Sequence, residues 1–421
     1  MKSGFYNKCL LVLAICILSS PLPSGAYSVL THEAIIDALW EKSIQPLLKQ
    51  KYPGLTEDQL KEAHAYAYGG AIAPDMGYFP FGSHLFTNLV HYVRSGDMVN
   101  AILAEAQDVN EYAFALGFMC HYMADKYGHS LGTNQSVPLM YPRMKEKFGG
   151  NVTYDENNIS HRRVEFAFDV LQTAKGNYAS QSYHDFIGFK VSIPVLERAF
   201  SKTYGMELTD VCKNLSVAVD LFRWSVMSLL PVLTQTAWVI RKNDILKMQP
   251  TATSKNFRYK MTKANYYEAF GKKNRSPGFL AYALSGLIRI LPKIGPLSVL
   301  KLKEPSLEAE KLFIQSFDTV LVNCSASMKV LSTENLDLKN IDFDTGKRTA
   351  PGEYKLADQN YGSLLLKLDK KKFDHLSAAL KLNIIEFYST SRSKIATRKG
   401  AREWKKITKA LKQLKASEPT A

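Results

Sequence analysis

Cysteine and long apolar runs are scarce in this sequence, and both shortages narrow what the protein can be. The 421-residue chain has five cysteines, of which Cys9 and Cys16 lie in an N-terminal apolar stretch. The other three allow at most one disulfide, which excludes a small disulfide-stapled scaffold. The apolar run from Cys9 to Leu18 is too short to span a bilayer. Clear period-two alternation, internal repeats and low-complexity segments are absent as well, which argues against β-sheet and repeat architectures.

Residues 1–26 have the pattern of a secretory signal peptide. Lys2 and Lys8 precede the apolar run, and Ser24-Gly25-Ala26 supplies the small residues that a cleavage site needs. We therefore expect cleavage after Ala26, a mature chain that begins at Tyr27, and a secreted or periplasmic location.

Apolar residues recur at three- and four-residue spacing through most of the chain, which predicts an all-α fold. The segments with this spacing are 33–48, 97–127, 161–175, 206–246, 305–331, 353–367 and 371–389. The polar stretch "QPTATSKN" at 249–256 is the best candidate for a domain boundary. We expect a first helical domain at 27–248, a further helical region at 257–390 and a basic tail at 391–421.

Charge is distributed unevenly along the chain. Residues 27–165 contain 11 Lys or Arg and 16 Asp or Glu, although the whole chain has a net charge of +15. The segment 392–415 has ten Lys or Arg and a single acid, Glu403. Its apolar residues fall on one helical face: Trp404, Ile407, Leu411 and Leu414. Such a tail suits contact with an anionic membrane or, less often, nucleic acid, and a solvated tail with a few packed apolar residues is the alternative.

The segment "CHYMADKYGHS", residues 120–130, spaces three polar side chains four residues apart: His121, Asp125 and His129. Four residues turn a helix by about 400°, so these side chains share one face. The preceding "EYAFALGFMC" is apolar nearly all round, which is typical of a buried helix. A bound cation would satisfy all three groups at once, and hydrogen bonds to neighbouring backbone are the alternative.

Histidines gather in the same part of the chain, because seven of the nine lie between positions 32 and 161. Further candidate ligands in this part are His32, Asp75, His84, His91, His161 and Glu165. Imidazole and carboxylate without thiolate suit zinc in a hydrolytic site, and there are enough groups for two or three ions. His64 and His184 fit none of these motifs, and we expect both to be structural or exposed.

The order and spacing of these motifs resemble the superfamily of zinc-dependent phospholipase C and P1 nuclease. The resemblance covers residues 27–170 and depends on a His five residues after the expected mature start, Asp75, "LVHY", "CHYMADKYGHSLG" and "HRRVE". The pattern H-x3-D-x3-H followed by Ser-Leu is similar to bacterial zinc-dependent phospholipase C-like proteins and to the catalytic domain of glycosylphosphatidylinositol-specific phospholipase D. The nuclease branch has five residues between that Asp and the second His, and its "QPLH" is missing here.

The resemblance implies an all-helical domain with three zinc ions in a cleft. It assigns the first ion to Asp75, His91 and His121. It assigns a second ion to His32 and to the amino nitrogen and carbonyl oxygen of Tyr27, with Asp125 bridging the two ions. It assigns the third ion to His129, His161 and Glu165. His84 remains an alternative to His91, although "LVHY" and the distance from Asp75 favour His91.

The function that the resemblance implies is hydrolysis of phospholipids or other phosphodiesters in the manner of phospholipase C. Zinc ions sharing a water would lower its pKa, and the resulting hydroxide would attack phosphorus, with Asp75 and Asp125 as the catalytic carboxylates. A P1-like single-strand nuclease and a zinc-binding membrane-surface protein without turnover are the alternatives. The headgroup and the choice between C-type and D-type cleavage stay open.

Residues 256–421 have no comparable motif. The stretch "NIDFDTGKRTAPGEYKLAD" contains Asp342 and Asp344, whose spacing matches no calcium-binding loop. We expect an ordinary turn with helix-capping groups there.

Overall fold

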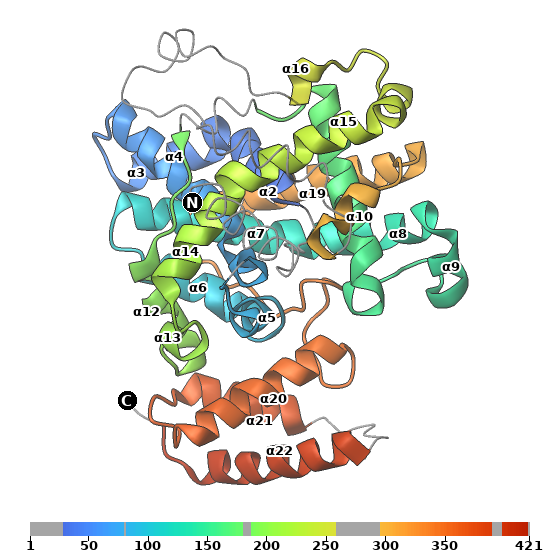
Figure 1. The fold of residues 1–421 in the computed structure, drawn as a ribbon. Coiled ribbons are helices and arrows are strands. Elements are labelled where there is room, and N and C mark those ends of the chain that lie inside the picture. The colour runs from blue at the N-terminus through green and yellow to red at the C-terminus, as the bar shows by residue number, and fades with distance from the viewer. Residues whose placement is uncertain (1–27, 80, 180–186, 258–294, 390–397, 420–421) are drawn as a thin grey trace, which may run out of the picture.

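The computed structural model describes residues 28–79, 81–179, 187–257, 295–389 and 398–419 (Figure 1). These residues form helices and no strand, apart from an isolated bridge between Ile341 and Arg348, which confirms the all-α prediction. None of the described helices is long and apolar enough to span a membrane. The expected signal peptide and Tyr27 lie outside the described residues.

The helices are listed here with their bounds. The first part of the chain contains α2 (Val29–Leu39), η1 (Trp40–Ile44), α3 (Gln45–Lys51), α4 (Glu57–Ile72), η2 (Ala73–Tyr78), α5 (His84–Tyr92), α6 (Ser95–Glu105), α7 (Val109–Tyr127), η3 (Gly128–Thr133), α8 (Asn134–Met140), α9 (Pro142–Phe148) and α10 (Tyr154–Lys175). The middle contains α12 (Ile193–Tyr204), α13 (Leu208–Val211), α14 (Leu215–Trp224), η4 (Ser225–Leu229), α15 (Leu230–Met248) and α16 (Ser254–Phe257). The last part contains η5 (Gly295–Lys301), α19 (Leu307–Leu331), α20 (Lys355–Lys370), α21 (Ala378–Ser389) and α22 (Arg398–Ala416).

Helix α7 runs through the centre of the main body (Figure 1) and is buried on all sides from Glu111 to Asp125. It starts at Asp108, whose carboxylate accepts hydrogen bonds from the backbone N–H groups of Asn110 and Glu111. The sequence predicted one helix over 97–127, but the cap at Asp108 divides this stretch into α6 and α7. The helix is therefore shorter than predicted, while its burial is as predicted.

Helix α4 packs closely on α7 because glycines lie at the crossing. A Cβ atom on Gly70 would lie 1.9 Å from the carbonyl oxygen of Phe114, and one on Gly117 would lie 2.1 Å from that of Ala67. Only a residue without a side chain fits at this distance. The close crossing brings the end of α4, and the η2 turn that follows it, next to the middle of α7.

Helix α19, which follows the expected domain boundary, packs against the main body beside η3 and α7. A Cβ atom on Gly132 would lie 2.7 Å from Ser316 Oγ, and the Phe313 ring stacks on Phe168 with a centroid distance of 4.6 Å. Chain segments on both sides of residues 249–256 therefore share one core.

Helices α20, α21 and α22 pack together at the lower end of Figure 1, where α20 also contacts α5. The apolar face of the basic tail is covered in this group: Ile407 and Leu414 are buried, and Trp404 and Leu411 are partly buried. The apolar face therefore packs within the protein, and contact of the basic face with an anionic membrane remains a prediction.

Candidate metal centre

The structure brings together eight of the nine predicted metal ligands in the interior of the main body, and the ninth, Tyr27, lies outside the described residues. The eight are His32, Asp75, His91, His121, Asp125, His129, His161 and Glu165, each at most 4% exposed. They form three groups in which the ligand atoms lie within 4.8 Å of one another. The groups are His32 with His121 and Asp125, Asp75 with His91 and His121, and His129 with His161 and Glu165.

The imidazoles of His91 and His121 are oriented by backbone carbonyl oxygens. Their Nδ1 atoms lie 2.8 Å from the carbonyl oxygens of Thr87 and Ala71. A carbonyl oxygen only accepts, so each Nδ1 donates its hydrogen and each neutral ring keeps its lone pair on Nε2. The two Nε2 atoms lie 3.4 Å apart. Lone pairs that converge in this way are stabilised by a cation between them.

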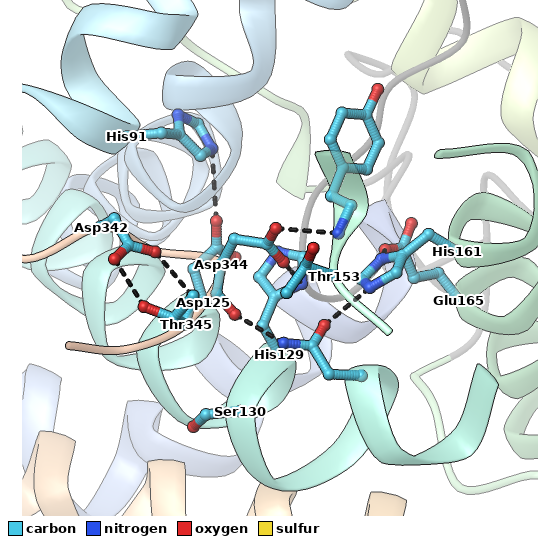
Figure 2. Close-up of polar contacts among 12 residues, drawn as sticks. His91, Asp125, His129, Ser130, Thr153, His161, Glu165, Asp342, Asp344 and Thr345 are labelled. Atoms are coloured by element: carbon cyan, nitrogen blue, oxygen red, sulfur yellow. Dashed lines mark hydrogen bonds and ion pairs between the residues drawn. The ribbon is translucent and has the colours of Figure 1, made fainter. Parts of the chain in front are cut away.

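Asp125 lies between the first two groups. Its Oδ2 lies 3.2 Å from Nε2 of His91 (Figure 2). The same Oδ2 lies 3.2 Å from Nε2 of His121, and Oδ1 lies 3.6 Å from Nε2 of His32. The His32 ring stacks on that of His121 with a centroid distance of 4.5 Å. One carboxylate therefore faces both groups with different oxygens, which is the geometry a bridging ligand requires.

The third group lies one turn further along, where α7 passes into the π-helical turn η3. His129 comes from this turn, and His161 and Glu165 lie one turn apart on α10. His161 Nδ1 lies 2.9 Å from Glu165 Oε1, and His161 Nε2 lies 2.7 Å from the side-chain oxygen of Asn134. An amide oxygen accepts from Nε2–H, so the lone pair of a neutral His161 faces Glu165.

Burial and charge act against each other in the first two groups. Burial raises the pKa of Asp75. Burial also disfavours ionised Asp125, but the facing His121 and His91 outweigh it and hold the pKa of Asp125 well below its usual value. Burial opposes a charge on His91, yet the carboxylates of Asp125 and Asp75 outweigh it and raise the pKa of His91 to about 10. Positive charge is thus favoured between these carboxylates, as a metal cation or as a proton on His91.

The distances among these atoms fit zinc. Two ligand atoms of a tetrahedral zinc ion with bonds of about 2.0–2.1 Å lie about 3.3–3.4 Å apart. His91 Nε2 lies 3.3 Å from Asp75 Oδ1 and 3.4 Å from His121 Nε2, and His121 Nε2 lies 3.2 Å from Asp125 Oδ2. Nitrogen and carboxylate oxygen are also the donors of hydrolytic zinc sites.

The structure separates the alternatives left open for the other histidines. His91 is buried among the carboxylates, whereas His84 is exposed at the first residue of α5. His64 is buried and stacks on Trp40 with a centroid distance of 3.9 Å, so it is structural, as predicted. His184 lies outside the described residues.

The structure agrees with the prediction of a turn with helix-capping groups at Asp342 and Asp344, because Asp344 Oδ2 accepts from the backbone N–H of Tyr154, the first residue of α10. The prediction missed the contact that the other oxygen of Asp344 makes. Asp342 caps the turn by accepting from the backbone N–H of Thr345, at 2.7 Å. Asp344 is 1% exposed, and its Oδ1 lies 3.2 Å from His129 Nδ1 (Figure 2). No motif in the sequence indicates this contact, because only the fold brings residue 344 to residue 129.

Asn134 was also missed by the sequence reasoning. It is buried, its amide oxygen faces His161, and its amide nitrogen donates to the backbone carbonyl of Asp344 at 2.7 Å. Its position five residues after His129 was the only available signal, and that signal is weak.

The fold and the buried site together define an all-α protein with three buried groups of histidine and carboxylate that could hold metal ions. Residues 31–214 match the family described as zinc dependent phospholipase C. The match confirms the resemblance seen in the sequence, because residues 31–214 are similar to this family. The match supports a hydrolase that acts on a phosphodiester or lipid.

Comparison with individual proteins gives one partial similarity and no solved structure. A protein of Archaeoglobus fulgidus described as uncharacterized is 23% identical over 201 residues, which are 46% of this chain and 50% of that protein. The chain therefore matches half the length of this relative. No solved structure matches the chain.

Proposed function

We propose that the protein is a zinc-dependent phosphodiester hydrolase that cleaves phospholipid headgroups in the manner of phospholipase C. The observation that carries the proposal is the assembly of eight buried histidines and carboxylates into three groups with zinc-like spacing. The family match over 31–214 supports the same reaction class.

Each group would hold one ion. Asp75, His91 and His121 would hold the first. His32 and the backbone nitrogen and oxygen of Tyr27 would hold the second, with Asp125 shared between the two. His129, His161 and Glu165 would hold the third. Zinc at these groups would supply Lewis acidity that activates a water and neutralises phosphate charge.

Asp75 is the carboxylate that we assign to the proton of the attacking water. It lies on η2 at the edge of the first group, and its burial raises its pKa. Asp125 is held ionised between the histidines and instead fixes the two groups relative to each other.

The substrate's negative charge has to be balanced by the metal ions. In the described residues, the ion-pair partners of the buried carboxylates Asp75, Glu165 and Asp344 are histidines. A phosphodiester would be repelled by these carboxylates unless bound cations reversed the local charge. Substrate binding is therefore expected to depend on metal.

Secretion and metal binding are linked in this proposal. The second ion needs the free amine of Tyr27, which exists only after cleavage following Ala26. A chain that retains residues 1–26 would lack this ligand. The proposal therefore places the active protein outside the cytoplasmic membrane.

The test is product analysis with the mature protein, residues 27–421, loaded with zinc and mixed with phosphatidylcholine vesicles. Diacylglycerol and phosphocholine that disappear on chelation would support phospholipase C cleavage. Phosphatidic acid and choline would instead indicate D-type cleavage. Cleavage of single-stranded DNA without lipid cleavage would favour the nuclease alternative. Bound zinc with no hydrolysis of any of these substrates would contradict the proposed substrate class.

A further inference from the structure

The loop of residues 338–346, here called the DFD loop, crosses the metal centre from the C-terminal part of the chain. Ser95 Oγ donates to the carbonyl oxygen of Ile341 at 2.7 Å, and the Tyr122 hydroxyl donates to that of Lys339 at 2.9 Å. These bonds fix the loop to α6 and α7. The DFD loop is therefore held against α6 and α7 beside the metal centre.

The middle residue of the loop is fixed against the first group of ligands. The backbone N–H of Phe343 donates to the carbonyl oxygen of His91 at 3.1 Å. Its ring lies 5.0 Å from the His91 ring, 5.9 Å from the His121 ring and 5.4 Å from the Tyr122 ring, centroid to centroid. This packing determines where the next residue, Asp344, enters the site.

The carboxylate of Asp344 is buried and anchored through one oxygen only. Oδ2 accepts from the backbone N–H of Tyr154 at 2.8 Å and from the hydroxyl of Tyr354. Oδ1 points to the third group and lies 3.2 Å from Nδ1 of His129. Among the described residues, neither Oδ1 of Asp344 nor Nδ1 of His129 has a well-aligned hydrogen-bond partner.

Two buried polar atoms without well-aligned partners, at this separation, match the edge of a zinc coordination sphere, which is about 3.3–3.4 Å. Burying polar atoms without hydrogen bonds costs free energy, which is normally offset by hydrogen bonds or by a metal. We propose that Asp344 is a further ligand of the ion held by His129, His161 and Glu165. The inference rests on the zinc centre proposed above.

A fourth protein ligand changes what the third ion can do. Zinc with four protein ligands is typical of closed, structural sites, whereas catalytic zinc keeps a position open for water or substrate. The third ion would then have fewer open positions for water than the other two, and its main contribution would be its charge and its hold on η3 and α10. Substrate chemistry is concentrated at the groups joined by Asp125. Asp344 lies outside the family match, so the C-terminal region completes the centre.

The competing role for Asp344 is to orient His129 without touching the ion. Carboxylates often accept the second ring N–H of a metal-bound histidine, and their loss typically weakens metal binding 10–100-fold. A loss of metal affinity within that range is expected of both roles. A spectroscopic signature of direct bonding separates them.

The direct test is Asp344→Cys in protein whose zinc is replaced by cobalt. A thiolate bonded to cobalt gives an intense near-ultraviolet charge-transfer band, which an orienting residue would not produce. The wild-type cobalt protein is the reference, because its buried Cys120, Cys212 and Cys324 are present in both samples. A new band supports the proposal, and a folded, cobalt-loaded variant without one overturns it.

The second test is the zinc content of Asp344→Asn, measured after exhaustive dialysis and compared with Asp337→Asn. Asp337 belongs to the same segment, but its side chain is 78% exposed. We expect Asp344→Asn to lose one zinc or to bind one zinc at least about 100-fold more weakly, beyond the usual effect of an orienting partner. Full zinc content and affinity in Asp344→Asn overturn the proposal. If the wild-type protein binds no zinc, the proposed function fails as well.

Discussion

The two halves of the metal centre are held in different ways. Around Asp125, backbone carbonyl oxygens orient the histidines, and the ligands come from helices within the family match. Around His129, side chains orient the ligands, and Asn134 bonds to Asp344, which is 210 residues away in the sequence. The described ligands of the first half therefore all come from the matched part of the chain, with Phe343 only packing against them, whereas the second half has a carboxylate contact from the C-terminal region.

The largest expected effect follows from replacing Asp125, the carboxylate that faces both of the first two ligand groups. Asp125→Asn removes the charge that faces three histidines. We expect loss of at least one zinc and of more than 99% of activity, since losing even an outer partner typically weakens binding 10–100-fold. Elemental analysis and vesicle hydrolysis measure both, with Asp337→Asn as the exposed control. Full activity would falsify the assignment of Asp125 as a shared ligand.

The next effect compares two histidines on one helix. His91→Ala should lose one zinc, because the His91 ring contacts both Asp75 and Asp125. His84→Ala should keep the full zinc content, because His84 is exposed at the start of α5. Elemental analysis of the two purified variants decides the matter. The reverse result would make His84 the ligand.

The pH dependence of zinc binding tests the role of His91 as a ligand in the first half of the centre. The pKa of His91 is raised to about 10, so zinc must displace a proton there even at pH 8. Apparent zinc affinity should therefore rise with pH, by about tenfold per unit for each proton released. Competition with a chromophoric chelator at pH 6, 7 and 8 measures the slope. An affinity that does not change over this range would contradict the role of His91.

The difference between the halves also determines what the sequence could predict. The ligands His121, Asp125 and His129 follow from spacing on one helix, because helical periodicity is a local property. The family resemblance added residues that fixed motifs identify, such as His161. Asp344 could not be predicted, because its role depends on the packing of Phe343 against the first group. The extents of α6 and α7 were missed for another reason: a single cap at Asp108 divided them.

A smaller effect is expected from the residue that orients His161. Asn134→Ala removes the oxygen that faces His161 Nε2 and the donor to Asp344. We expect one zinc to bind 10–100-fold more weakly while the other zinc sites are unchanged. Stepwise zinc titration separates the sites, with Gln135→Ala on the same helix as the control. Equal weakening at all sites would indicate a general loss of fold instead.

The smallest effect on the metal centre is expected from the C-terminal helices. Leu414 is fully buried in α22, so Leu414→Ala should destabilise this helical group by about 2–5 kcal/mol. Zinc content should change little, because hydrogen bonds to α6 and α7 fix the DFD loop, and in the described residues the hydrogen bond that reaches Asp344 from the C-terminal helices is that of Tyr354, directly before α20. Thermal unfolding and elemental analysis of the same sample measure both quantities. Loss of zinc in this variant would show that α20–α22 also hold Asp344 in place. The second half of the centre would then depend on the C-terminal helices as well as on the DFD loop.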